Sequence, residues 1–471
     1  MTSSINATSV LRDIRFWILF FFLIRLYGIT LPPLEVGHNW RQADVLSIAR
    51  NFYEHDPNPL HPTVDVAGEK SGLVGCEPPV LNYLVYLVSV VFGYDHWYGR
   101  LIVLITTTIG TFFFYKLVRK YFEEQTAFFS TMVLLVSYWF ACSRKTIPDP
   151  FAGALCIVAS YYALNYLEAG KVWQLLIFFL LALVGCLEKA LAGSMLTVLA
   201  IPMLRPEYPL ARKIGLAVTS ALIVVAFFVW FFIWVPQVNA MGDFEGHFFM
   251  GMTFDVGLQD IVSNRALMLK RFMDVPLKYV GFTAFVASLV VMIWKRSWYV
   301  LAVFLLPFVS YSVMLIKTGA SITYDTYYFT TLVPAMAFLV GCGLARIPNV
   351  KIAYIILLVI GVESIADQIY SFRIRQPFLA LEELEPILDH LSAPGDAIAI
   401  NSGIHNPTAM YMAHRRGWSV FSETLSDTTF VRQIHQQGCK LVVVGRKLYG
   451  DFDLPYPKVY ESEYYKIFKL E

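Results

Sequence analysis

The sequence predicts a mainly α-helical polytopic membrane protein with a small α/β domain at its C-terminal end. Of the 471 residues, 57% are hydrophobic and only 15% are charged, whereas soluble domains average about 45–50% apolar and about 25% charged residues. Apolar runs of span length recur as far as residue 370, and beyond that point the charge density rises. No basic tract or aromatic-basic repeat is present, so nucleic acid is not an expected partner.

The first apolar run, 16–31, has no small-residue cleavage site before the polar loop, so we expect it to be a retained span and not a signal peptide. Arg12 and Arg15 precede it and predict a cytoplasmic N-terminus. The loop 32–96 then lies outside. Within it, 80–92 is apolar but has only 13 residues, and a span needs at least about 17. We therefore expect an interfacial helix there.

Assigning successive loops to alternate sides of the membrane supports an interfacial helix at 80–92 and predicts about eleven spans. If 80–92 does not cross, every short basic connector falls on the cytoplasmic side, as the positive-inside rule requires. The ten expected spans after the first are 97–117, 126–143, 150–167, 172–187, 190–204, 213–235, 279–294, 298–316, 327–344 and 350–369. The expected domains are thus 1–370 in the membrane, with the outer loop 32–96, and 371–471 outside.

The tail changes from long apolar runs to short ones. Ala397–Ile400, Leu441–Val444 and Tyr464–Leu470 have the length of strands, and Pro377–Leu391 reads as a helix before them. Strands that alternate with helices predict a small α/β domain.

The stretch that follows the first span predicts a second surface helix. At 100° per residue, one side is polar and the other is apolar. Trp40, Asp44, Ser47 and Asn51 share the polar side, and Val45, Ile48, Ala49 and Phe52 the apolar side. Such a helix would hold the Asp44 carboxylate at the water–lipid boundary. The plain alternative is a surface helix with a solvated polar face.

Five charged or aromatic groups gather on the predicted outer face. Ionisable residues next to hydrocarbon are costly and tend to be functional, although helix capping would also explain Glu77 or Asp149, an ion pair Glu188 and Lys189, and an aromatic belt the tyrosines. The groups are His38, Arg41 and Asp44; Glu77 before two prolines; Arg144, Lys145 and Asp149; Glu188 and Lys189; and Tyr324 and Tyr327. No cysteine or histidine spacing predicts a metal site.

These residues resemble the GT-C membrane glycosyltransferases, in the branch of the dolichyl-phosphate-mannose protein mannosyltransferases and the lipid A aminoarabinose transferase. The resemblance covers about residues 1–345. It depends on the acidic first outer loop, the Glu77-Pro78-Pro79 helix start, Pro148-Asp149-Pro150, Glu188-Lys189, and Tyr327-Tyr328 with Val333-Pro334-Ala335.

The resemblance implies transfer of a sugar from a polyprenyl-phosphate donor to a hydroxyl or amine of a lipid, glycan or protein, with inversion. The reaction would occur on the periplasmic side of the inner membrane. Asp44 would be the base, with His38 as its rival, because the family's acidic residue usually lies near Arg41. Asp149 would orient the base or the acceptor, or help to bind a cation. Lys189, Arg144 and Lys145 would face the donor phosphate, since Glu77 stands where the family often has lysine.

Other readings stay open at this point. A transporter or channel for a polar or lipid-linked solute would place charges at mid-membrane, whereas here they lie at span ends on one side. A non-catalytic scaffold would show no activity when purified. The sequence names neither the sugar nor the acceptor, and it leaves dependence on a divalent metal open.

Overall fold

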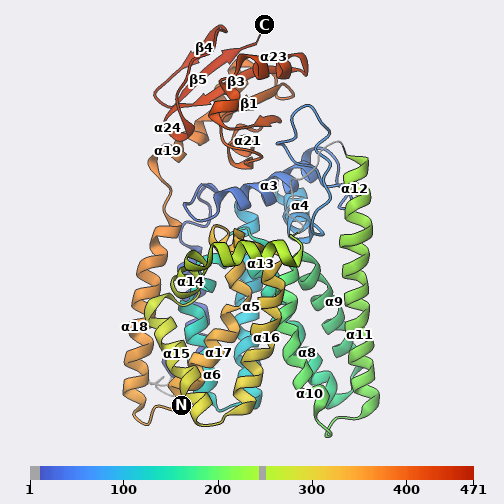
Figure 1. The fold of residues 1–471 in the computed structure, drawn as a ribbon, viewed down its shortest axis with the longest axis vertical. Coiled ribbons are helices and arrows are strands. Elements are labelled where there is room, and N and C mark those ends of the chain that lie inside the picture. The colour runs from blue at the N-terminus through green and yellow to red at the C-terminus, as the bar shows by residue number, and fades with distance from the viewer. Residues whose placement is uncertain (1–10, 243–250, 471) are drawn as a thin grey trace, which may run out of the picture. The chain divides into compact units, whose positions relative to one another are not determined.

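The computed structural model describes residues 11–242 and 251–470, and its contacts divide the chain into two compact units (Figure 1). The first unit comprises residues of 1–29, 100–229 and 250–370, and the second comprises 30–99, 230–249 and 371–471. The first outer loop thus groups with the tail. The predicted division at residue 370 stays a prediction.

The first unit is a bundle of apolar helices, typical of a multi-pass membrane protein. Figure 1 shows α8, α9 and α11 side by side, and α8 packs against α9 and α9 against α11. Its helices are α2 (Ile14–Leu26), α5 (Trp97–Tyr121), α6 (Glu124–Val136), α7 (Tyr138–Cys142), α8 (Pro148–Ala169), α9 (Val172–Glu188), η1 (Ala190–Leu199), α10 (Ala200–Leu204), α11 (Leu210–Val229), α13 (Phe254–Ser263), α14 (Arg265–Asp274), α15 (Lys278–Trp294), α16 (Trp298–Ile316), η3 (Gly319–Thr323), η4 (Thr326–Thr331), α17 (Val333–Ala345) and α18 (Val350–Gln368).

The helix lengths do not establish the predicted count of about eleven spans. Among the described residues, five helices are long and apolar enough to cross a membrane, or six if the bent pair α14–α15 forms one span. Other predicted spans are shortened or broken. Span 126–143 is interrupted at Ser137, whose backbone is extended, and 190–204 is a 3-10 helix for its first ten residues. Local breaks of this kind leave little trace in hydropathy.

The second unit contains a five-stranded mixed sheet in the order β2-β1-β3-β5-β4. β1 pairs in parallel with β2 and β3, and β5 runs antiparallel to β3 and β4. Its elements are α3 (Asn39–Glu54), α4 (Val80–Phe92), η2 (Trp230–Trp234), α12 (Val235–Met241), η5 (Ile369–Phe372), α19 (Gln376–Leu379), η6 (Ala380–Glu383), α20 (Leu384–Leu391), β1 (Ala397–Ile400), α21 (Pro407–Ala413), β2 (Gly417–Ser419), α22 (Ser422–Leu425), α23 (Thr428–Gln436), β3 (Cys439–Gly445), α24 (Arg446–Tyr449), β4 (Lys458–Glu461) and β5 (Tyr465–Lys469).

A hydrophobic core lies on each face of this sheet, and α3 contributes residues to one of the two cores. Along β3, Leu441 and Val443 face one core, and Val442 and Val444 face the other. The first core contains residues of α20, α21 and α3, and the second contains Val431 and Ile434 of α23. A strand buried on both faces reads as a continuous apolar run, which is why β3 was predictable. β2 and β4 are too short and polar to have been found.

A histidine links α3 to the tail. His414 forms hydrogen bonds with Glu54 of α3 at 2.9 Å and with Glu385 of α20 at 2.7 Å. Hydrogen bonds to Glu385 and Glu54 raise the pKa of His414 to about 9. A histidine in an unfolded chain titrates near pH 6.5. The stabilisation is therefore complete below about pH 6.5 and is lost as the pH rises through about 9.

We expect His414→Asn to lower the melting temperature of the purified protein at pH 7, and to lower it much less at pH 10. Asparagine tolerates the left-handed backbone of this position, where φ is 48°. His390→Asn is the matched control, because His390 lies exposed on α20, and it should change neither value. An equal loss for His414→Asn at both pH values would contradict the linkage.

Candidate functional site

Helix α3 begins after a residue with an unusual backbone. His38 precedes the helix in the left-handed region, with φ 61°, where residues other than glycine are uncommon. Its neighbour Asn39 accepts a hydrogen bond on its side-chain oxygen from the backbone N–H of Trp40, at 2.7 Å. Because α3 starts here, Arg41 and Asp44 follow one helical turn apart on the same face.

Arg41 holds two carboxylates together. Its guanidinium donates to Asp44 Oδ2 at 2.7 Å and to Glu77 Oε1 at 3.1 Å. Asp44 is 1% exposed and Arg41 is buried as well. Glu77 lies just before α4, which packs on α3, and Asn82 of α4 donates to the Val45 carbonyl at 2.8 Å. An opposite charge this close favours the charged form of a carboxylate.

The burial of α3 corrects one expectation. The sequence predicted an apolar side and a polar side that faces the water–lipid boundary, or plain solvent. Instead, every residue from Arg41 to Phe52 is buried. The polar side is covered because its members pair within the protein, and an amphipathic pattern cannot tell such a face from a solvated one.

A second buried network, missed by sequence reasoning, fixes the middle of α3. Asp65 accepts from Arg50 at 3.3 Å and from Asn51 at 2.9 Å. Arg50 also donates to the Tyr411 carbonyl at 2.9 Å and lies 4.6 Å from the Tyr411 ring centroid. Burial is the largest single influence and lowers the pKa of Arg50, but the charge of Asp65 together with those of Tyr411, Tyr94 and Glu54 outweighs it, and the pKa is raised. The signal in the sequence for this network was the adjacent polar pair Arg50 and Asn51 in α3.

Asp149 lies in the first turn of α8 and is 0% exposed. Capping of this helix was the simple explanation for it. However, the N-cap is Ile147, and no side chain caps it. Asp149 sits inside the helix, after Pro148, where the helix dipole favours a negative charge. Capping therefore does not account for this buried carboxylate.

Lys189 pairs with Asp149 and lies over two tyrosines. Its Nζ is 3.6 Å from Asp149 Oδ2, and it is 4.4 Å from the Tyr328 ring centroid and 5.5 Å from that of Tyr327. Lys189 is 9% exposed, and a buried ammonium between a carboxylate and aromatic faces is a compact point charge. Tyr328, which was not predicted as a site residue, belongs to this group.

The other predicted site residues of the first unit differ in their burial and in their contacts. Arg144 donates to the Tyr27 carbonyl at the end of α2, and the Lys145 side chain is fully buried. Glu188 is buried at the end of α9. Tyr327 is 2% exposed, so it is no member of a surface aromatic belt, whereas Tyr324 is 75% exposed and lies apart from it.

The structure thus assembles two clusters, each within its own unit. Arg41, Asp44 and Glu77 form one, and Asp149, Lys189 and Tyr327 form the other. That both clusters face one reaction site stays a prediction. Among the described residues, no group of three His, Cys, Asp or Glu side chains could hold a metal ion.

Comparison with known proteins gives a family match for part of the chain. The family model described as dolichyl-phosphate-mannose-protein mannosyltransferase matches residues 76–234. No curated protein matches the sequence.

Solved structures match nearly the whole chain. ArnT from Cupriavidus metallidurans bound to undecaprenyl phosphate has a TM-score of 0.61 at 12% identity, covering 96% of this chain and 98% of that one. The apo structure has a TM-score of 0.60 and covers 97% of that chain. This chain has the GT-C fold. The resemblance predicted from the sequence is confirmed at that level. The mycobacterial arabinofuranosyltransferase AftD, with a TM-score of 0.56 and 12% identity, shares the GT-C fold over 92% of this chain and 35% of its own.

We expect Lys189→Met to destabilise this protein strongly, by about 3 kcal/mol, because it leaves the Asp149 charge buried with less compensation. The double variant Lys189→Met/Asp149→Leu should melt at a higher temperature than Lys189→Met alone. Thermal unfolding in detergent measures both values. Lys171→Met, at an exposed lysine before α9, is the control. A double variant that melts below both single variants would contradict the coupling.

Proposed function

We propose that this protein is a glycosyltransferase that uses a polyprenyl-phosphate-linked sugar. It transfers the sugar to a hydroxyl or amine of a lipid, glycan or protein acceptor, on the periplasmic side of the inner membrane. The observation that carries the proposal is the likeness, over nearly the full length of both chains, to an ArnT with undecaprenyl phosphate bound. The match to the mannosyltransferase model supports the same reaction class.

The chemistry needs a base and a place for the departing phosphate. The acceptor oxygen or nitrogen attacks the anomeric carbon of the sugar, and the bond from that carbon to the phosphate oxygen breaks. The electron pair leaves with the polyprenyl phosphate, and the acceptor proton passes to the base. A lipid phosphate is a good leaving group, so a general acid is less needed. Attack from the face opposite the phosphate inverts the anomeric centre.

Asp44 is the proposed base. It pairs with Arg41 at 2.7 Å and is shielded from bulk water, and the low dielectric strengthens its hydrogen bond to an acceptor. Arg41 also limits its basicity, so proton transfer completes late, once the acceptor oxygen has bonded to the sugar. His38, at the start of the same helix, is the rival base.

Lys189 is the proposed partner of the donor phosphate, and Arg144 and Lys145, which precede Asp149 in the sequence, are further candidate cations. A fixed cation aimed at developing phosphate charge stabilises the transition state without reorganisation. Asp149 holds the Lys189 ammonium in position through the 3.6 Å contact. On this reading Asp149 is a positioning residue. Glu77 keeps Arg41 in place from α4.

We expect Asp44→Asn to lower sugar transfer by about 10²–10⁴-fold, the usual worth of a general base. Purified protein would be supplied with a panel of polyprenyl-phosphate sugars, and consumption of the donor would be followed. Asp95→Asn, at a half-exposed aspartate of the same loop, is the control and should transfer at the wild-type rate. Full activity in folded Asp44→Asn, with loss in His38→Asn, would move the base to His38.

A further inference from the structure

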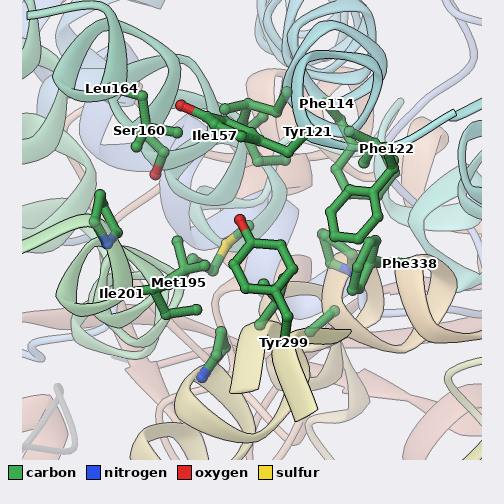
Figure 2. Close-up of a pocket in the computed structure, with 18 of the residues that line it drawn as sticks. Phe114, Tyr121, Phe122, Ile157, Ser160, Leu164, Met195, Ile201, Tyr299 and Phe338 are labelled. Atoms are coloured by element: carbon green, nitrogen blue, oxygen red, sulfur yellow. The ribbon is translucent and has the colours of Figure 1, made fainter. Parts of the chain in front are cut away.

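An apolar cavity lies in the first unit, and neither Asp149 nor Lys189 lines it (Figure 2). It has a volume of about 140 Å³. Helices α5, α8, α10, α16 and α17 line it, together with η1. Figure 2 shows Phe122, Tyr299 and Phe338 on one part of the wall and Met195 and Ile201 on another.

The distance along α8 separates this cavity from the carboxylate cluster. Leu164 lines the cavity and follows Asp149 by 15 residues in the same helix. At 1.5 Å per residue, it lies about 22 Å from Asp149 along the helix axis. Ile157 and Ser160 also line it, so the cavity extends from the middle of α8 toward the end that the positive-inside rule assigns to the cytoplasm.

Prolines and small side chains explain why a space remains between the helices at this cavity. Pro307 lies inside α16, where it has no N–H for the Val303 carbonyl and bends the helix. Pro334 starts α17, and Ala335 beside it presents only a methyl group. Ser160 returns its hydroxyl to the Cys156 carbonyl of its own helix at 2.9 Å. The hydroxyl of Ser160 is thus engaged within its own helix and adds little polarity to the cavity wall.

One cation interrupts this apolar wall. Arg205 follows α10, and its guanidinium lies 5.0 Å from the Tyr299 ring centroid. Lys213 donates to its carbonyl and fixes the connector. Within the part of the chain that the structure describes, no carboxylate lies within ion-pair distance of Arg205. Tyr121, which lines the cavity, donates its hydroxyl to Glu168 at 3.0 Å, and Glu168 pairs with Lys120 at 2.6 Å.

We propose that this cavity binds one acyl chain of an anionic phospholipid, whose phosphate pairs with Arg205. The apolar wall matches a hydrocarbon chain, and a cation without a carboxylate partner matches a phosphate at its end. Arg212 and Lys213 begin α11 directly after this connector, and they strengthen the attraction of an anionic head group. Water-soluble anions would gain nothing from the aromatic and aliphatic wall.

The test compares lipids on the full-length protein in detergent. Native mass spectrometry would measure binding of phosphatidylglycerol and of phosphatidylcholine with the same acyl chains. We expect phosphatidylglycerol to bind about fivefold more tightly, the factor that corresponds to one basic residue at an anionic surface. Arg205→Gln should abolish this preference and leave the binding of phosphatidylcholine unchanged. Lys351→Gln, at an exposed lysine of another inner connector, should keep the preference.

A second variant tests whether the cavity binds the acyl chain of the lipid. Ala335→Phe fills the cavity and should reduce binding of both lipids while Arg205 remains in place. Equal binding of the two lipids by the wild type would overturn the proposal, as would unchanged phosphatidylglycerol binding in folded Ala335→Phe. Stronger competition by undecaprenyl phosphate than by phosphatidylglycerol would also overturn it, because the occupant would then be the donor lipid. None of these outcomes depends on transferase activity.

Discussion

The contact between Arg41 and Asp44 is the interaction on which the account of this protein depends. An aspartate that is 1% exposed carries a large desolvation cost unless a cation compensates it. Arg41 does so at 2.7 Å and shares its charge with Glu77 of the neighbouring helix start. The same constraint recurs in the bundle, where Lys189 compensates Asp149. In both places a helix end supplies the carboxylate or its partner, which keeps the charges at the ends of apolar elements.

The rest of the second unit serves to hold α3 rigid. Ile48 and Phe52 pack into the core on one face of the sheet, and Arg50 joins Asp65 to Tyr411 of α21. A carboxylate that must accept a proton in one orientation benefits from such support, since small displacements of a catalytic group reduce its efficiency. The tail is therefore more than a separate appendage, because its sheet forms part of the core around the helix that carries Asp44.

Much of this could be predicted from the sequence. Hydropathy located most helices of the bundle, although α13 and α14 were not predicted. Short apolar runs located β1 and β3, because a strand buried on both faces has no polar alternation, and β5 was found although it contains Lys466 and Lys469. The break at Ser137 and the 3-10 segment η1 were not visible, since both lie within apolar stretches of the sequence. These breaks are why helix length does not establish the predicted number of spans.

The candidate site was predictable as a set of residues but not as an arrangement. Composition identified Arg41, Asp44, Asp149 and Lys189, because charges at the ends of apolar runs are rare. It could not show that α3 is buried on its polar side, since that depends on partners such as Asp65, Tyr411 and His414, which lie far away along the chain. Tyr328 was obscured by its resemblance to an ordinary interfacial aromatic residue.

The central proposal is that α3, which carries Asp44, lies at the donor sugar. A polyprenyl-phosphate sugar that carries a photoreactive group on the sugar, crosslinked to the protein and mapped by peptide mass spectrometry, tests it most directly. The account predicts adducts in α3 and competition by the unmodified donor. Adducts that the unmodified donor competes away but that lie entirely outside α3 would contradict it.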